Sequence, residues 1–205
     1  MPELSHIDPR SAALLVMDYQ VDALTRFMTT AQSADAIACV PDLIAMARDA
    51  GMMVIHVVVA FRPGHPEVSP RNPLFSALKA NGMAVAGSEG AAIHPAAAAR
   101  EGEPIVVKHR ISPFVGTDLE TLLRANGIDT LVLAGVHTSG VVLSTVRQRR
   151  RFGLSVGHRT RLLRRPRCRG ACDAARHRHR EAGGRRHHGG ARRRPVWQVF
   201  MRSEE

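Results

Sequence analysis

The chain has 205 residues, of which 44% are hydrophobic and 23% charged, and its formal net charge is +11. This length suits one α/β domain with its own core, and the apolar fraction excludes wholesale disorder. The charge is unevenly divided, with a net −4 over residues 1–146 and a net +15 over residues 147–205, so any case for nucleic-acid binding rests on the C-terminal part alone.

The first part of the chain alternates strand-like apolar runs with helical patterns. Continuous apolar and β-branched runs predict strands that are buried on both faces. Apolar residues spaced by three and four predict helices, and Gly51 and Gly127 supply stop signals. The predicted strands are, in chain order, Ala12–Met17, Met53–Ala60, Pro104–Val107, Thr130–Ala134 and Phe152–Val156. The predicted helices are Ala34–Ala50, Asp118–Ala125 with Thr117 as its N-cap, and Ser139–Arg149, while Arg62–Asn72 is predicted to be a loop.

This alternation predicts an α/β fold with a mostly parallel sheet, and no internal repeat is visible. No run of 18 apolar residues is present, which predicts no membrane span, and the start MPELSHIDPR lacks the pattern of a secretory signal. Three cysteines do not make a disulfide framework, so we expect a cytoplasmic protein.

Polar residues follow three of the predicted strands at their carboxyl ends. Asp18 follows the first strand, Lys108 the third, and the segment GVHTSGVV the fourth. Ligands bind beyond the carboxyl ends of parallel strands, so we expect these segments to converge on one site. A carboxylate and an amine beside a strand-to-helix turn could form an acid/base pair, with backbone amides after Gly135 holding an anion.

These segments carry a family resemblance. LLVMDYQ resembles the opening strand and D-x-Q motif of the isochorismatase-like (cysteine hydrolase) superfamily, and KHRISPFVGTDLETLLRANGIDTLVLAGVHTSGVVLST resembles its next two blocks. The resemblance implies a Rossmann-like three-layer sandwich with a sheet of five to six strands, formed by residues 1–156. It also implies a homodimer or higher homo-oligomer that acts on a small-molecule substrate, without a cofactor, a metal or a nucleic-acid partner.

The resemblance also assigns site residues. Active members use an Asp, a Lys and a Cys; Asp18 and Lys108 match the first two as catalytic residues, whereas Val141 stands at the nucleophile position and cannot react. The substrate-binding positions that the resemblance implies are Gln20, Phe114, His137, Thr138, Ser139 and Gly140. The family also implies a cis peptide bond between Val136 and His137.

Two functions therefore remain open. In the first, the protein is a hydrolase that works without a cysteine, with Asp18 as acid or base and Lys108 stabilising negative charge; isochorismatases, which cleave vinyl ethers, also lack the thiol. In the second, it is an inactive member of the family that serves as a binding or scaffold protein.

Two histidines are interpreted as structural. His65, in RPGHPEV, stands where some relatives carry metal-binding histidines, but a single histidine without a second ligand predicts a loop residue. His56 lies within a predicted strand and is expected to be a core histidine with a hydrogen-bond partner.

Residues 157–205 form a segment rich in Arg and His that has almost no apolar periodicity. Three interpretations compete: a basic arm for nucleic acid, a zinc site, and a reading-frame error. Permitted codons for residues 165–191, read one base forward, can give DPDAEVHATLLDTVIAKRADVVTTAEL, which has a helical pattern, a terminal strand and a resemblance to the family's usual ending. We therefore expect this segment to be the out-of-frame remainder of the same domain.

Overall fold

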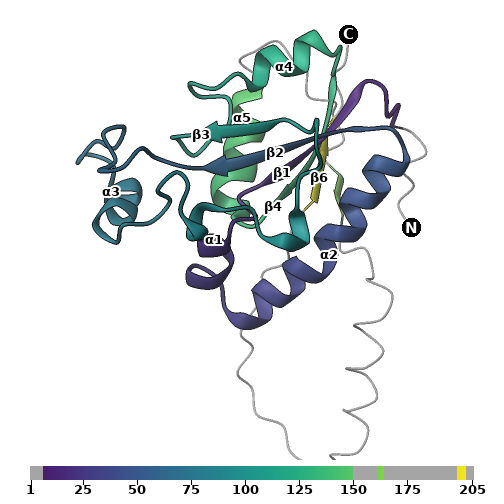
Figure 1. The fold of residues 1–205 in the computed structure, drawn as a ribbon. Coiled ribbons are helices and arrows are strands. Elements are labelled where there is room, and N and C mark those ends of the chain that lie inside the picture. The colour runs from purple at the N-terminus through teal and green to yellow at the C-terminus, as the bar shows by residue number, and fades with distance from the viewer. Residues whose placement is uncertain (1–6, 150–160, 164–197, 202–205) are drawn as a thin grey trace, which may run out of the picture.

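The computed structural model describes residues 7–149, 161–163 and 198–201, and a six-stranded sheet lies at its centre (Figure 1). The strand order is β3-β2-β1-β4-β6-β5. The four parallel strands are β1 (Ala12–Met17), β2 (Met53–Val59), β3 (Ile105–Lys108) and β4 (Thr130–Gly135). Two short segments, β6 (Gln198–Met201) and β5 (Arg161–Leu163), continue the sheet beyond β4, with β6 antiparallel to both neighbours.

The mostly parallel sheet and the α/β class are confirmed, but the parallel part has four strands where five to six were expected. The predicted strand Phe152–Val156 and most of the Arg/His-rich segment lie outside the described residues. The chain passes from β1 to β2 and β3 on one side, then returns to place β4 on the other side of β1. A switch point therefore lies between β1 and β4, where open α/β sheets bind their ligands.

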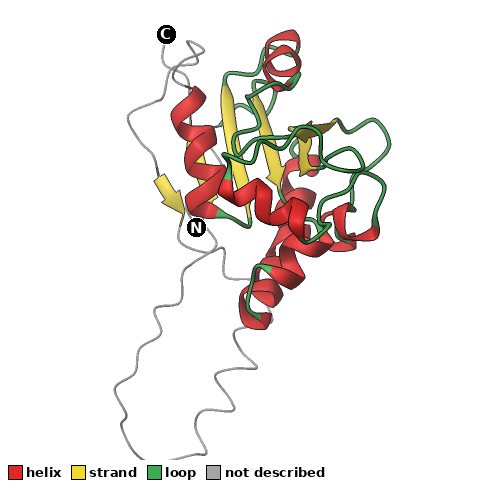
Figure 2. Cartoon of the chain, turned by 90° about the vertical axis from the view of Figure 1, so that its left-hand side faces the viewer, coloured by secondary structure: helices red, strands yellow, loops and turns green. Residues whose placement is uncertain are grey.

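Helices cover both faces of the sheet, which gives three layers (Figure 2). They are α1 (Val21–Arg26), α2 (Thr30–Asp49), α3 (Pro73–Ala80), α4 (Leu119–Ala125) and α5 (Leu143–Arg149), with short 3-10 turns η2 (Glu89–Ala91) and η3 (Pro95–Ala97). Successive side chains of β1 point to opposite faces. Leu14 and Val16 pack with the buried face of α2, whereas Leu15 and Met17 pack with residues of α4 on the other face.

The predicted helix Ala34–Ala50 is confirmed but begins earlier, at Thr30. Thr29 and Gln32 form a capping box, in which the Thr29 hydroxyl accepts from the Gln32 amide and the Gln32 side chain accepts from the Thr29 amide. The missed α3 begins after Asn72, whose side chain accepts from the Phe75 amide and which precedes Pro73. Asn followed by Pro is a helix-start signal that the loop prediction did not extend to.

Candidate active site

Asp18 occupies a constrained position at the end of β1. Its φ is 62°, in the left-handed region that non-glycine residues adopt infrequently and Asp tolerates better than most. Its amide donates to the carbonyl of Val57 in β2 at 2.9 Å, which fixes this conformation. A buried carboxylate held in such a backbone conformation is typical of functional sites.

Lys108 ends β3 and reaches across the end of β2 to Asp18. Its Nζ lies 3.1 Å from Oδ1 and 3.3 Å from Oδ2 of Asp18, and it donates to the carbonyl of Ile111 at 3.1 Å. Asp18 is 6% exposed and Lys108 is 2% exposed. The predicted convergence of these two residues is therefore confirmed, and the pair is buried.

The two oxygens of Asp18 are not equivalent. Oδ2 accepts a hydrogen bond from Lys108, whereas Oδ1 is buried and has no partner with hydrogen-bond geometry among the described residues. A buried carboxylate oxygen without a hydrogen bond is costly to stability. The Lys108 ammonium, 3.1 Å from Oδ1, offsets part of this cost.

The third segment follows β4 as a π-helical turn, η4 (Thr138–Val142), which leads directly into α5. Single π-helical turns are frequent at functional sites, and the sequence pattern predicted a regular helix here. Val141 is 2% exposed and its carbonyl accepts from the Thr145 hydroxyl at 2.6 Å. The backbone of Thr138 and Ser139 belongs to this turn.

The expected cis bond between Val136 and His137 is wrong. The described residues contain no cis peptide bond. The Val136–His137 peptide is trans, and the Gly140 amide donates to the His137 carbonyl at 3.1 Å. A trans bond avoids the roughly 3 kcal/mol that a non-proline cis bond costs.

A cavity of about 390 Å³ opens beside the ion pair. Asp18, Lys108, His137, Gly140 and Val141 all line it, so the structure brings these five predicted site residues together. Most of its remaining wall is apolar. Among the described lining residues, Gln20 is the one further residue that the sequence predicted. The lining residues that the sequence did not predict are Asp22, Ala23, Phe27, Val59, Leu74, Phe75, Leu78, Met83, Ala84, Gly90 and Ile111.

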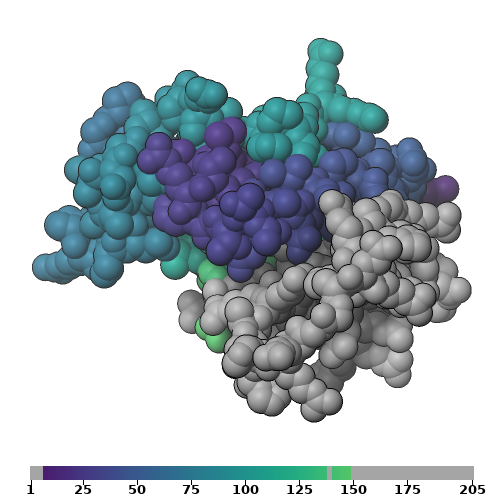
Figure 3. Space-filling view, turned by 90° about the horizontal axis from the view of Figure 1, so that it is seen from below, coloured from purple at the N-terminus to yellow at the C-terminus, as the bar shows by residue number. Residues whose placement is uncertain are grey.

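Part of the missed wall comes from α1 and α3 and the residues that follow them. Figure 3 shows the purple and indigo surface of α1 and α2 beside the blue to teal surface that contains α3. Phe27 and Leu74 are each 51% exposed although they are large and apolar. Apolar residues in a short segment after the D-x-Q motif were the available signal for this wall, and they carry no helical period long enough to be recognised.

Gln20 lines the cavity, but its side chain is occupied by structural hydrogen bonds. Its amide nitrogen donates to the carbonyls of Val59 at 2.9 Å and Ala91 at 2.7 Å, and its oxygen accepts from the Val59 amide at 2.8 Å. Gln20 thus ties the ends of β1 and β2 to η2. This arrangement favours a positioning role over direct binding of substrate.

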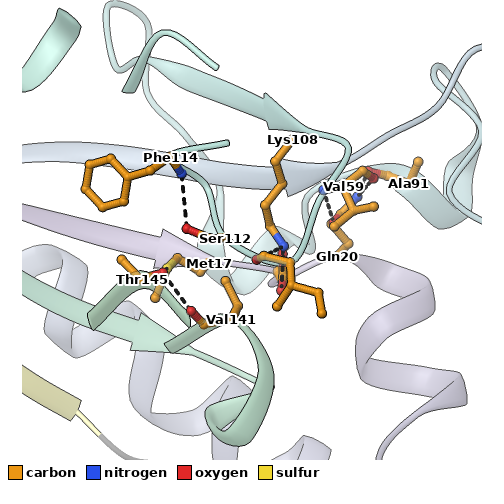
Figure 4. A network of polar contacts seen from close by, with 11 residues as sticks. Met17, Gln20, Val59, Ala91, Lys108, Ser112, Phe114, Val141 and Thr145 are labelled. Carbon is orange, nitrogen blue, oxygen red and sulfur yellow. Dashed lines mark hydrogen bonds and ion pairs between the residues drawn. The ribbon is translucent and has the colours of Figure 1, made fainter. Parts of the chain in front are cut away.

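Phe114 does not line the cavity. It is 6% exposed and packs in the core with residues of α4 and η4. Figure 4 shows the Phe114 ring pointing away from Lys108, whose side chain extends toward the end of β1. The motif fixed its place in the chain, but a backbone position alone does not give the direction of a side chain.

His137 lies at the cavity wall, with its ring 6.0 Å from that of Phe27 in an edge-to-face arrangement. Burial lowers the pKa of His137; Asp18 opposes this shift and Lys108 adds to it. A lowered pKa keeps the imidazole neutral at neutral pH, so it can accept or donate a hydrogen bond.

His65 and His56, the two histidines interpreted as structural from the sequence, both have buried side chains with a polar neighbour. His65 is buried and its Nε2 lies 2.7 Å from the Met83 carbonyl. His56 Nε2 lies 3.1 Å from Glu103 Oε2. Within the described ranges, no group of three or more His, Cys, Asp or Glu side chains is placed to hold a metal ion. The same residues include no helix of the length and apolarity needed to cross a membrane.

The fold and the site define a class: a parallel α/β protein with a buried Asp–Lys pair at the carboxyl edge of its sheet. Residues 12–156 match the model of the isochorismatase domain, so the chain belongs to the isochorismatase family.

Two curated relatives have different described activities. The chain is 32% identical to maleamate amidohydrolase of Pseudomonas putida over 140 residues, which are 65% of this chain and 62% of that protein. It is 33% identical over 142 residues to the "probable inactive nicotinamidase" of Arabidopsis thaliana, covering 67% of this chain and 71% of that protein. The chain thus spans less than two thirds of the maleamate amidohydrolase.

Solved structures share the fold. A cysteine hydrolase from Pseudomonas syringae superposes with a TM-score of 0.66 at 25% identity, covering 73% of this chain and 70% of that one. N-carbamoylsarcosine amidase from Thermoplasma acidophilum gives a TM-score of 0.57 at 26% identity, covering 68% of this chain and 75% of that one.

Proposed function

We propose that this chain is a hydrolase of a small molecule, in which Asp18 transfers the proton, Lys108 stabilises negative charge and water is the nucleophile. The buried Asp18–Lys108 pair carries this proposal, because it places a carboxylate and an ammonium together in the wall of one cavity. Val141 supplies no nucleophile, so a covalent intermediate at that position is not part of the reaction.

The step balances without a thiol. For an amide or ester, Asp18 accepts a proton from water as the water oxygen bonds to the carbonyl carbon of the substrate. The π electron pair of the C=O bond moves to the carbonyl oxygen. The ammonium of Lys108 and the amides of the turn after Gly135 stabilise this negative charge. When the bond to the leaving group breaks, Asp18 returns the proton to that group and is again ionised.

Amides are the first substrates to test, because two relatives are by name an amidohydrolase and an amidase. Enol ethers are the second class: for them Asp18 would have to start protonated, give its proton to the vinyl carbon, and recover a proton from the water that attacks the resulting cation. A panel of small amides, esters and enol ethers should therefore contain a substrate of the wild-type protein.

The test compares the wild-type protein with Asp18→Asn and with the matched variant Asp42→Asn, whose residue is exposed on α2 away from the cavity. We expect Asp18→Asn to lower kcat/KM by at least about 100-fold, in the range expected for loss of a general acid–base group. Asp42→Asn should leave it unchanged. Equal rates for wild type and Asp18→Asn would overturn the proposal.

The second candidate function is a binding protein without catalysis. Val141 favours it, since a side chain without a reactive group fills a cavity-lining position. No turnover across the panel, together with ligand binding that survives Asp18→Asn, would support this candidate.

A further inference from the structure

A second carboxylate, that of Asp22 on α1, lies in the wall of the cavity. Its Oδ1 lies 3.0 Å from Nε of Arg26, one turn along the helix, where the Arg26 side chain is 61% exposed. The Asp22 side chain itself is 19% exposed. The arginine therefore approaches this carboxylate from the solvent side.

The other face of the Asp22 carboxylate rests on Gly90, in η2. A Cβ at position 90 would lie 2.2 Å from Oδ2 and 2.4 Å from Cγ of Asp22. Gly90 does not have a positive φ, so its backbone is compatible with other residues. Space for the Asp22 carboxylate, rather than backbone conformation, is what a glycine provides at this position.

The charged residues of the cavity wall disfavour an anionic ligand. Among the described residues that line it, Lys108 is the one Lys or Arg, and its charge is already balanced by Asp18. An anionic ligand would meet no free counter-ion and would lose its hydration against an apolar wall, which is costly. A neutral ligand would avoid that cost, and a cationic one would gain from Asp22, because its partner Arg26 is 61% exposed and the solvent weakens that surface ion pair.

We propose that the cavity selects neutral or cationic small molecules with an apolar body and rejects carboxylates, with Asp22 as the specificity-determining residue. Asp22 accepts a hydrogen bond from an N–H donor of the ligand, and the apolar side chains from α1 and α3 contact its body. The inference rests on the proposed function for its biological meaning, but it concerns binding alone.

Three probes of nearly the same size and shape test it: benzamidine, a cation; benzamide, which is neutral; and benzoate, an anion. Calorimetry at pH 7.5 and constant ionic strength gives their dissociation constants without turnover as the readout. For the wild-type protein we expect affinity to fall from benzamidine to benzamide to benzoate, with benzamide binding at least about tenfold more tightly than benzoate.

Asp22→Asn should lower the affinity for benzamidine by about tenfold and change the affinity for benzamide by less than about threefold. Only the cation loses a charge partner in this variant. Gly90→Ala should act in the same direction by displacing the Asp22 carboxylate. Asp42→Asn, which removes the same charge from an exposed position on α2, should leave all three constants unchanged.

Three results would overturn the inference: benzoate binding as tightly as benzamide, an unchanged affinity for benzamidine in Asp22→Asn, or no saturable binding of any probe. The proposed function fails by a separate result, undiminished hydrolysis in Asp18→Asn, which leaves the order of the three probes interpretable.

Discussion

Asp18 and Lys108 illustrate how much one residue's surroundings determine its chemistry. Each follows a different strand, and β2 separates those strands in the sheet. They meet because parallel strands present their carboxyl ends at one edge, where the long Lys108 side chain can reach the short Asp18 carboxylate across the intervening strand. Burial of both groups excludes bulk water and strengthens their interaction.

Val141 allows a direct test of this electrostatic setting. Val141→Cys places a sulfur at the cavity wall next to Lys108, in a volume close to that of valine. The Lys108 ammonium favours the thiolate, whereas burial and the Asp18 carboxylate oppose it; a thiol pKa below the ordinary value of about 8.5 is the result expected if the ammonium dominates. The pH dependence of its alkylation by iodoacetamide, resolved by peptide mass spectrometry, measures this pKa.

Val142→Cys is the matched control, because Val142 is fully buried in the core and does not line the cavity. We expect the cysteine at position 142 to react far more slowly than the one at position 141. A thiol at position 141 that reacts no faster than the one at position 142 would show that the cavity does not favour an anionic nucleophile. That result would favour a binding protein without catalysis.

At this scale the sequence predicted the positions of Asp18, Lys108 and the turn after β4, because strand ends and a motif are properties of the chain. It did not predict the structural roles of the Gln20 and Phe114 side chains. The Gln20 amide is saturated by Val59 and Ala91, and the Phe114 ring lies in the core. Both outcomes depend on partners distant in sequence, which a local pattern does not contain.

Among the elements, α2 and β2 are joined by a partly buried polar cluster that does not line the cavity. Glu103 receives two hydrogen bonds of 2.7 Å from Arg48 of α2, and its Oε2 lies 3.1 Å from His56 of β2. The Arg48 hydrogen bonds are the main reason that the pKa of Glu103 falls from its ordinary value of 4.5 to about 2.

A lowered carboxyl pKa is a statement about stability. The ionised form is favoured in the folded state, so the contribution is fully present above pH 4.5 and is lost as the pH falls toward 2. We expect Glu103→Gln to lower the free energy of unfolding by about 2 kcal/mol at pH 7, with the deficit shrinking below pH 4.5. Urea unfolding at several pH values measures this difference.

The matched control is Glu101→Gln, at an exposed position two residues earlier. Its free energy of unfolding should stay within about 0.5 kcal/mol of the wild-type value at every pH. A Glu103→Gln deficit that persists unchanged at pH 2 would contradict an origin in the ionised carboxylate.

The strands of the parallel sheet and the helices α2 and α4 were predictable, α4 despite its seven residues because Gly127 marks its end, whereas α1 and α3 were not. β1, β2, β4 and α2 bury continuous or periodic apolar residues, and their patterns are visible in the chain. α1 and α3 have six and eight residues, too few to show a helical period. Five residues of the cavity wall come from these two helices, so the specificity of the site was the part least accessible from sequence.

For the whole molecule, the charge distribution raises a question about the chain itself. Residues 147–205 carry a net +15, and residues 157–205 have almost no apolar periodicity, although the short strands β5 and β6 lie within them. A GC-rich gene read out of frame yields Arg, Gly, Ala, Pro and His in excess, as found here. We propose a frame change near the start of this segment; the cytoplasmic location and the homo-oligomer likewise stay predictions.

Sequencing the coding DNA across residues 147–205, together with the intact mass of the native protein, checks this prediction. We expect an insertion or deletion relative to an open frame that encodes a string close to DPDAEVHATLLDTVIAKRADVVTTAEL, and a mass that differs from that of the printed sequence. A mass equal to that of the printed sequence would contradict it.

The central claim is that hydrolysis depends on Asp18 and on no thiol. Its most direct test is kcat/KM for a substrate from the panel, measured on wild-type protein before and after exhaustive alkylation by iodoacetamide, beside Asp18→Asn. The account predicts that alkylated wild type keeps its rate within about twofold while Asp18→Asn loses at least about 100-fold. Loss of activity on alkylation, or full activity in Asp18→Asn, would contradict it.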